Sequence, residues 1–357
     1  MLSRRARVTR AAVLGVLFLL TGCNADAPAK PLTVVGWGGS SQRAHRDAYW
    51  TSFVVHTGIQ LHEDTWHGGI DVLRDKARGD VDWDVVQVEV EELLLGCKEG
   101  LFEPIDWQAL GGRDAFIEPS VQDCGVGAMV WSQLFGYDAS RIPNGPRSWA
   151  DFWDVHRFPG RRGLRRTPKY TLEFALMADG VAPADVYKVL RTEAGVERAF
   201  RQLDRIAPHA LWWTSISQVP ELLKSGEVAM SVTSPGRLLV ANREEGRNFK
   251  VIWDGNIYAV DFWVILNGSR RKSQALRLIQ YMKQPEQEAR LAHFIPTGLS
   301  NRQAIAGLEP ALQVDTPSNP SNLQHAVELD AQFWVEHYSE LTRRFDAWLA
   351  NQEININ

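Results

Sequence analysis

The chain has 357 residues, and its 39 Lys and Arg residues nearly balance its 43 Asp and Glu residues, which leaves a formal net charge of −4 at pH 7. This balance lacks the overall basic character of nucleic-acid-binding or membrane-surface proteins, so no nucleic-acid partner is expected. The length exceeds that of one ordinary hydrophobic core and favours two domains, and the 14 Trp residues suit walls against flat or cationic ligands.

Residues 1–23 have the features of a bacterial export signal. Four arginines precede an apolar stretch at residues 11–20, which is too short for a stable membrane span. Cys23 directly follows a Leu-Thr-Gly sequence, which resembles the lipobox of bacterial lipoproteins and implies cleavage before Cys23 and lipidation of its thiol. The alternative is an ordinary signal peptide with a chance cysteine. Residues 24–31 are small, polar and proline-bearing, and they predict a flexible tether.

Short apolar runs alternate with helix-period segments between residues 32 and 97. Strands are predicted at residues 32–35, 59–64 and 83–88, and helices at residues 43–56, 69–77 and 90–97. This order predicts a parallel sheet covered by helices, and ligands of such sheets lie beyond the carboxyl ends of the strands. Trp37, Trp66 and Glu89 all fall just after a predicted strand.

Two long apolar runs, residues 128–137 and 257–265, predict strands that leave the first lobe and return to it. Between them, helices are expected at residues 172–178, 195–206 and 219–225, and short strands at residues 227–232 and 250–253. Helices follow at residues 273–283 and 286–294. Residues 333–350 predict a last helix with an apolar face, formed by Trp334, Tyr338, Leu341, Phe345 and Trp348.

Cys97 and Cys124 are the two cysteines that remain after lipidation of Cys23. An even pair in an exported protein predicts a disulfide, and two reduced buried thiols are the alternative.

The turn at residues 36–39, Gly-Trp-Gly-Gly, follows the first predicted strand. It lacks the third glycine of a dinucleotide-binding fingerprint and the Gly-Lys-Ser/Thr of a phosphate-binding loop. A Trp within the turn would also block the close approach of a pyrophosphate. The sequence therefore predicts that Trp37 contacts a solute, with packing over the first helix as the alternative, and no nucleotide or other cofactor is expected.

His62 and His67 do not predict a metal site. They lie five residues apart, so they share neither a helix face nor a strand face. The chain also lacks the Gly-x-Ser-x-Gly motif of serine hydrolases, and no catalytic residue is predicted.

Two acids are candidate ligand contacts, one at the end of an apolar strand and one within such a strand. Glu89 points to the same side as Gln87 and could face an amine, and Asp261 lies inside an apolar strand, where a buried carboxylate is costly unless it is paired. Asp261 is thus expected to await a cationic ligand, or to be tied to a backbone N–H or an Arg. A basic cluster at residues 161–169 predicts a solvated face, with docking to anionic lipid or to a partner as the alternative.

In their order along the chain, several segments resemble extracellular solute-binding proteins of ABC importers, of the spermidine/putrescine type. They are residues 34–39, residues 83–107, TPKYTLEFALMADGV at 167–181, GEVAM at 226–230, YAVDFWVI at 258–265 and the last helix. The resemblance implies an α/β, two-lobed periplasmic-binding-protein fold, in which each lobe has a mostly parallel sheet flanked by helices and crossing strands join the lobes. Residues 32–133 with 262–302 would form lobe 1, and residues 134–261 with 303–351 would form lobe 2.

The resemblance also implies a ligand site. Trp37 resembles the aromatic residue that lines the cleft, Glu89 a polar contact, and Asp261 the acid that pairs with the ligand amine. Tyr170 stands where polyamine binders of the family place a carboxylate, and Ser234 where an aromatic is usual, so both positions depart from the pattern of polyamine binders. Trp213, Trp131 or Trp263 could supply the missing aromatic walls.

The expected function is capture of a small amine, foremost a polyamine, and its delivery to an ABC permease by a monomer that a lipid anchor holds at the membrane, on the periplasmic side. A zwitterionic, amino-acid-like solute is the alternative, with Arg237 holding its carboxylate. An exported two-lobed enzyme and a sensor lipoprotein that serves no permease also remain open.

Overall fold

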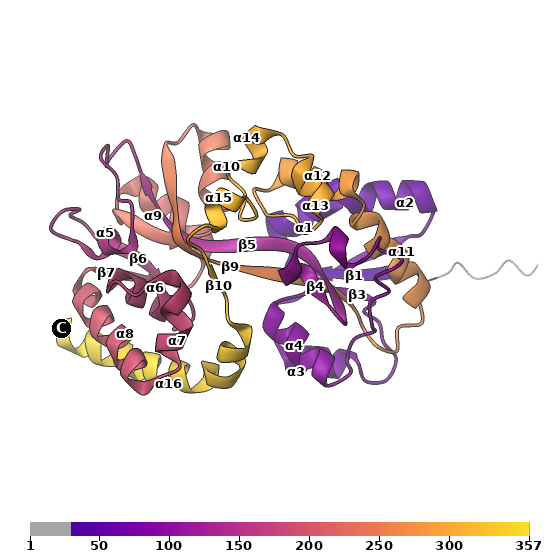
Figure 1. Ribbon diagram of the computed structural model, residues 1–357, viewed down its shortest axis with the longest axis horizontal. Coiled ribbons are helices and arrows are strands. Elements are labelled where there is room, and N and C mark those ends of the chain that lie inside the picture. Colours follow the sequence, from indigo (N-terminus) through magenta and orange to yellow (C-terminus); the bar gives the residue numbers. More distant parts are fainter. Residues whose placement is uncertain (1–29, 357) are drawn as a thin grey trace, which may run out of the picture. The chain divides into compact units, whose positions relative to one another are not determined.

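The computed structural model describes residues 30–356, and one mixed sheet of ten strands organises them (Figure 1). The expected signal peptide and the expected lipidation site, Cys23, lie outside these residues. The neighbouring strands follow the order β2-β1-β3-β9-β5-β8-β6-β7, while β10 pairs with β9 and β4 with β5. The strands are β1 (Leu32–Gly36), β2 (Leu61–Thr65), β3 (Val85–Val88), β4 (Val121–Gln122), β5 (Gly125–Asp138), β6 (Arg162–Arg165), β7 (Ala210–Trp213), β8 (Met230–Thr233), β9 (Phe249–Ile265) and β10 (Val327–Glu328).

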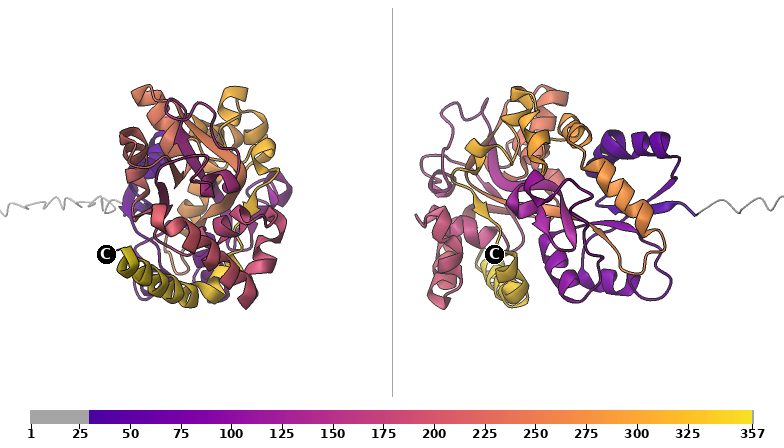
Figure 2. Two further views of the ribbon diagram at one scale, coloured as in Figure 1. Left: turned by 90° about the vertical axis from the view of Figure 1, so that its left-hand side faces the viewer. Right: turned by 45° about the vertical axis from the view of Figure 1, so that its right-hand side comes forward.

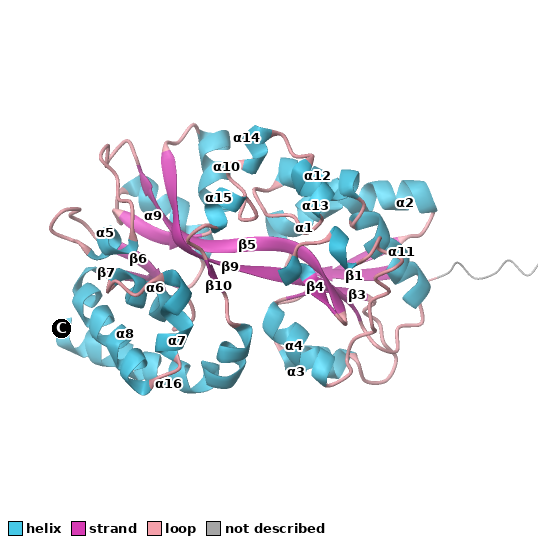
Figure 3. Cartoon of the chain, in the orientation of Figure 1, coloured by secondary structure: helices cyan, strands magenta, loops and turns pink. Residues whose placement is uncertain are grey.

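Helices flank the strands (Figures 2 and 3). They are α1 (Gly39–His45), α2 (Thr51–Thr57), α3 (Ile70–Lys76), α4 (Val90–Lys98), α5 (Trp149–Trp153), α6 (Thr171–Ala178), α7 (Val186–Leu190), α8 (Glu193–Ile206), α9 (Val219–Ser225), α10 (Pro235–Glu245), α11 (Lys272–Met282), α12 (Pro285–Phe294), α13 (Arg302–Ala306), α14 (Pro310–Gln313), α15 (Pro320–Leu323) and α16 (Ala331–Ile356). A π-helical turn joins α1 to α2. Within the described part of the chain, no helix combines the length and the apolar character that crossing a membrane would need.

The two long strands predicted from their apolar runs are confirmed as β5 and β9, which pair antiparallel and cross from one end of the sheet to the other. At one end β1 pairs in parallel with β2 and β3, and at the other β6 pairs in parallel with β7 and β8. We call the elements around β1–β3 the first lobe and those around β6–β8 the second lobe. The predicted α/β, two-lobed architecture with crossing strands is therefore confirmed.

Strand β9 departs from the prediction in one respect. The separate strand expected at residues 250–253 is the beginning of β9, which continues to Ile265. Strand β7 was not predicted, because its four residues show no strand pattern by themselves and become a strand by pairing with β6, 48 residues earlier in the chain.

Strands β1 and β3 of the first lobe have apolar residues at successive positions, because both faces of the sheet are covered. Val34 and Val85 pack on one face of the sheet with Leu278 of α11, while Val35 and Val86 pack on the opposite face. Successive side chains of a strand point to opposite faces, so a strand that is covered on both faces needs apolar residues at every position.

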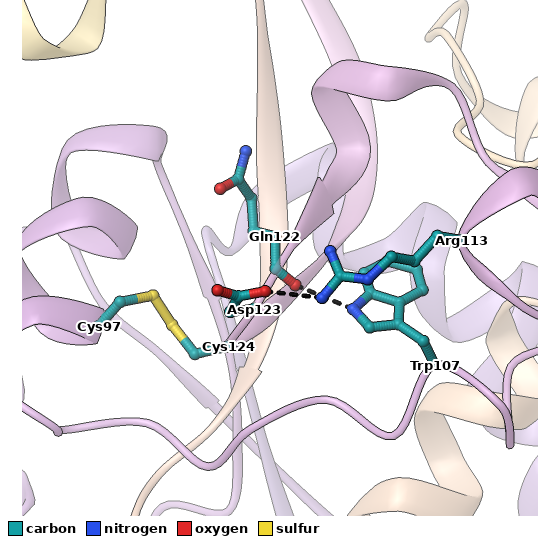
Figure 4. Close-up of a disulfide and its surroundings, with 6 residues drawn as sticks. All are labelled: Cys97, Trp107, Arg113, Gln122, Asp123 and Cys124. Atoms are coloured by element: carbon teal, nitrogen blue, oxygen red, sulfur yellow. Dashed lines mark hydrogen bonds and ion pairs between the residues drawn. A yellow bond between two sulfur atoms is a disulfide. The ribbon is translucent and has the colours of Figure 1, made fainter.

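The predicted disulfide between Cys97 and Cys124 is confirmed (Figure 4). It joins the end of α4 to the turn before β5, and the two Cα atoms lie 6.0 Å apart. Next to it, the Trp107 indole donates a hydrogen bond of 3.1 Å to the Gln122 carbonyl, and the Arg113 guanidinium lies 2.6 Å from Asp123 Oδ1. The turn before β5 is thus fixed at three points.

The last helix, α16, begins and ends beyond the predicted residues 333–350. Trp334, Leu341 and Phe345 are buried against the second lobe, as the apolar face predicted. Tyr338 of the same predicted face is 47% exposed, because it borders a cavity between α4 and α16.

Candidate functional site

Asp261, in the middle of β9, lies at the centre of the candidate site. Its side chain is almost fully buried, and it accepts hydrogen bonds from three side chains. Oδ2 accepts from the Trp37 indole (2.7 Å) and from the Gln87 amide (2.9 Å), and Oδ1 accepts from the Trp131 indole (2.7 Å). Among the described residues, no Lys, Arg or His forms an ion pair with Asp261. The carboxylate is therefore held by dipoles alone.

The sheet brings these four residues together from distant parts of the sequence. Gln87 lies in β3 opposite Trp263 of β9, and Met129 of β5 lies opposite Asp261. Trp37 follows β1, where Gly38 and Gly39 both adopt positive φ angles (70° and 58°) that a larger residue would disfavour. The glycines of this turn therefore serve the chain reversal into α1, which leaves Trp37 free to reach Asp261.

Burial, followed by the nearby charge of Glu89, raises the pKa of Asp261 to about 8, although the three N–H donors act in the opposite direction. A carboxyl group with this pKa is only partly ionised at pH 7. A cation placed beside it would favour the charged form and bring the pKa down. The site is thus suited to a ligand that carries an ammonium group.

Aromatic rings extend the site on one side. Trp37 stacks on Trp66, with ring centroids 5.1 Å apart and planes 13° from parallel. The Trp66 indole donates to the Gln87 carbonyl (2.9 Å), which fixes the stack against β3. An ammonium group beside Asp261 would therefore also meet the π-electrons of the half-buried Trp37 indole ring.

A cavity of about 670 Å³ lies between α1 and α10, and Trp131 forms part of its wall. Ser234 and Arg237 line it from the second lobe, at the N-terminal end of α10. Arg237 is exposed, and within residues 30–352 its guanidinium makes no ion pair. A helix N-terminus next to an unpaired Arg favours a carboxylate.

A second cavity, of about 520 Å³, lies between α4 and α16. It contains Glu89, whose side chain is 41% exposed, and the neighbouring acids Glu91 and Glu92, whose oxygens lie within 4.8 Å of one another. Lys169 contacts Glu91 directly, and its Nζ lies 3.5 Å from Glu89 Oε2. Burial raises the pKa of both Glu91 and Glu92.

Tyr170 lies between the two cavities. It is buried, with a φ angle of 72° that is unusual for a residue with a side chain, and it directly precedes α6. Its ring meets the Trp131 ring edge-to-face at 5.9 Å. Because Trp131 lines the first cavity and Tyr170 the second, this pair separates them.

The structure brings together most of the residues expected at the site, namely Trp37, Glu89, Tyr170 and Asp261, with Ser234 across the first cavity. Trp213 and Trp263 lie elsewhere: both are at most 2% exposed and belong to the hydrophobic cores of the second and first lobes. Their indole nitrogens face no partner within the described residues, so they take no part in the hydrogen bonds around Asp261.

Sequence reasoning missed the roles of Gln87 and Lys169, and named Trp131 only as one possible wall. Gln87 could have been found, because strand alternation puts it on the side of Glu89. Lys169 gave no signal, because it belongs to the basic cluster that predicted a solvated face. That interpretation is wrong for two members of the cluster: Lys169 is buried, and so is Arg162, whose guanidinium donates to backbone carbonyls such as that of Phe152 (2.6 Å).

Comparison with known proteins agrees with this architecture. A family model described as bacterial extracellular solute-binding protein matches residues 69–314. The gamma-aminobutyric acid-binding protein of Pseudomonas aeruginosa is 39% identical over 345 residues, which cover 96% of each chain. The solved structure of a receptor for gamma-aminobutyric acid (GABA) is 27% identical with a TM-score of 0.79, and the match covers 90% of this chain and 98% of that one.

The expected spermidine/putrescine type is a more distant relative. The spermidine/putrescine-binding periplasmic protein of Escherichia coli is 24% identical over 309 residues, covering 81% of this chain and 86% of that protein. The family is nevertheless the one that the sequence resembled. The family model matches more than half of the chain, and the Pseudomonas aeruginosa relative is 39% identical over 96% of each chain. The chain therefore belongs to the bacterial extracellular solute-binding proteins.

Proposed function

We propose that this protein is the substrate-binding component of an ABC importer and that it captures an amino-acid-like solute with one ammonium and one carboxylate group, such as GABA. The observation that carries the proposal is the buried Asp261 carboxylate, which three N–H donors hold in place without a cation. A desolvated carboxylate attracts an ammonium group more strongly than an exposed one does, because the surrounding dielectric is low.

The first cavity supports the other half of the proposal. A short ω-amino acid whose ammonium group lies at Asp261 would extend past Trp131 toward Ser234 and Arg237. Arg237 could then bind the carboxylate with two N–H donors. The relatives named for GABA are also more similar to this chain than the one named for spermidine and putrescine, so the zwitterionic alternative is better supported than the polyamine.

The remaining parts of the proposal concern the whole transport cycle. The two lobes, with the boundaries expected from the sequence, close on the solute, and the permease recognises the closed form. Cys23 carries the lipid that keeps the protein at the membrane in the periplasm. The relatives are binding proteins, and they give the alternative of an exported enzyme no support.

The proposal is tested by thermal unfolding of the protein that begins after Cys23, with GABA, other ω-amino acids, α-amino acids, putrescine and spermidine. A ligand at a hundred times its dissociation constant adds about 2.7 kcal/mol to the free energy of unfolding, which raises the midpoint by roughly a few degrees. We expect this shift with ω-amino acids. A shift with polyamines alone would restore the polyamine interpretation, and no shift with any amine would refute the proposal.

A further inference from the structure

Lys169 is a buried cation beside the candidate amine site. It lies in the loop between β6 and α6 of the second lobe, and it is 8% exposed. Its ammonium group contacts Glu91 of α4, in the first lobe, and lies 3.5 Å from Glu89 Oε2. Burial by itself would lower the pKa of Lys169, but Tyr170, Glu91 and Glu89 outweigh this effect and raise it well above its usual value. Lys169 is therefore charged at any physiological pH.

Glu89 connects Lys169 to Asp261. Its carboxylate lies near the Lys169 ammonium, and its charge is also the second cause of the raised pKa of Asp261. Glu89, Glu91 and Glu92 lie together in the second cavity, and the charge of Glu89 links this acidic group to Asp261 of β9. Lys169 supplies the one ammonium group that the chain itself places against these acids among the described residues.

A solute whose ammonium group is bound at Asp261 can extend in two directions. Toward the first cavity it meets Arg237 and the N-terminus of α10, which suit a negative group. Toward the second cavity it passes the Trp131–Tyr170 pair and meets Glu89 and Glu91, which would suit a second positive group. The Lys169 ammonium already occupies this second position.

We propose that Lys169 determines the specificity of the site by taking the place, at Glu89 and Glu91, that the second ammonium group of a linear diamine would need. A diamine would have to bring its second charge next to a like charge that cannot move away, because Glu91 and the Tyr170 ring hold it. An ω-amino acid has no such charge and avoids the conflict. This inference rests on the proposed function, since it takes Asp261 to bind the first ammonium group.

The test compares wild-type protein with Lys169→Gln by isothermal titration of putrescine and GABA. Without the Lys169 charge, Glu89 and Glu91 become available, and we expect the affinity for putrescine to rise at least about tenfold while that for GABA changes less than about threefold. Lys169→Arg retains the charge and should keep putrescine binding weak. Lys188→Gln removes an exposed lysine that pairs with Asp185 elsewhere on the second lobe, and it should leave both affinities unchanged.

Lys169→Met retains the apolar stem, so it replaces the Gln variant if the latter does not unfold cooperatively. The inference is overturned if neither variant gains affinity for putrescine, or if GABA and putrescine gain by the same factor. If one of these outcomes occurs and the wild-type protein binds GABA, the specificity role of Lys169 fails but the proposed function stands. If wild-type protein binds no single-amine solute but the variants bind putrescine, the specificity role of Lys169 is upheld and the proposed function fails. If none of these proteins binds an amine, both fail.

Discussion

The burial of the Asp261 carboxylate is unfavourable in the unliganded protein. It becomes favourable only when a bound cation pairs with the carboxylate. With a pKa of about 8, the carboxyl group must lose a proton before it can pair with an ammonium group at pH 7, at a cost of about 1.4 kcal/mol. The bound ammonium ion then restores a charge pair in a site from which water is excluded. Recognition at this residue is therefore linked to protons, and its strength depends on pH.

Removing the Asp261 charge should weaken the binding of the ammonium group. In Asp261→Asn we expect the affinity for GABA to fall by roughly 2–3 kcal/mol, because the ammonium group loses its charged partner. The amide oxygen can still accept from Trp37 and Gln87 in the place of Oδ2, whereas the Trp131 indole loses its acceptor. Isothermal titration at pH 6, 7 and 8 is the measurement. The wild-type affinity should rise about tenfold per pH unit below pH 8, since the ligand binds the ionised form, and it should level off above.

The control for this variant is Asp254→Asn, which alters an exposed acid of the same strand that pairs with His325. Its affinity and pH dependence should match those of the wild type. If Asp261→Asn retains the wild-type affinity, the solute binds elsewhere and the amine site has been assigned to the wrong residue.

At the scale of elements, hydrogen bonds to one buried acid, Glu173, connect three helices of the second lobe. Glu173 of α6 is fully buried, and its Oε1 accepts hydrogen bonds from the Tyr187 hydroxyl of α7 and from the Trp334 indole of α16, both of 2.8 Å. Burial raises the pKa of Glu173 to about 7. Trp334 and Tyr338 of α16 also line the second cavity, so this contact fixes one wall of it.

Glu173 should make the stability of the second lobe depend on pH. Its folded-state pKa lies above the ordinary value, so the stabilisation is complete below about pH 4.5 and is lost as the pH rises through 7, by up to about 3 kcal/mol. Urea unfolding between pH 5 and 9 should therefore show a fall that is smaller in Glu173→Gln. Asp261 contributes in the same direction between about pH 4 and pH 8, so Asp261→Asn removes its share. Equal slopes in the wild type and Glu173→Gln would contradict this role.

At the scale of the whole molecule, the disulfide restricts the unfolded chain. Cys97 and Cys124 are 27 residues apart, and closing a loop of this length stabilises the folded state by about 3.5 kcal/mol on the chain-entropy estimate. The double variant Cys97→Ser/Cys124→Ser should lose roughly this amount in chemical unfolding. Reduced wild-type protein should match it, and the affinity for solute should remain, because neither cysteine lines the two cavities. A variant as stable as the wild type would show that packing alone fixes the turn before β5.

The sequence by itself determined the class of fold, the order of the first strands and helices, the two crossing strands and the disulfide. These follow from local physics: strands covered on both faces must be apolar throughout, and an exported chain with two cysteines favours their pairing. Asp261 could also be singled out, because one acid within an apolar strand needs a partner. The extent of β9 and the presence of β7 could not, because they depend on pairing between distant segments.

Only the tertiary structure decided what surrounds Asp261. Trp37, Gln87 and Trp131 are 224, 174 and 130 residues away from it in the sequence, and the sheet register alone makes them its donors. The tertiary structure also decided the places of Trp213 and Trp263. Their aromatic rings would suit the wall of a ligand site, but their strands direct them into the hydrophobic cores. The sequence shows Lys169 as one of several cations in a basic cluster, and only the folded structure places it beside Glu89 and Glu91. Strand alternation tells which side chains share a face, but which face lies against the core and which distant segments pair are properties of the packed chain.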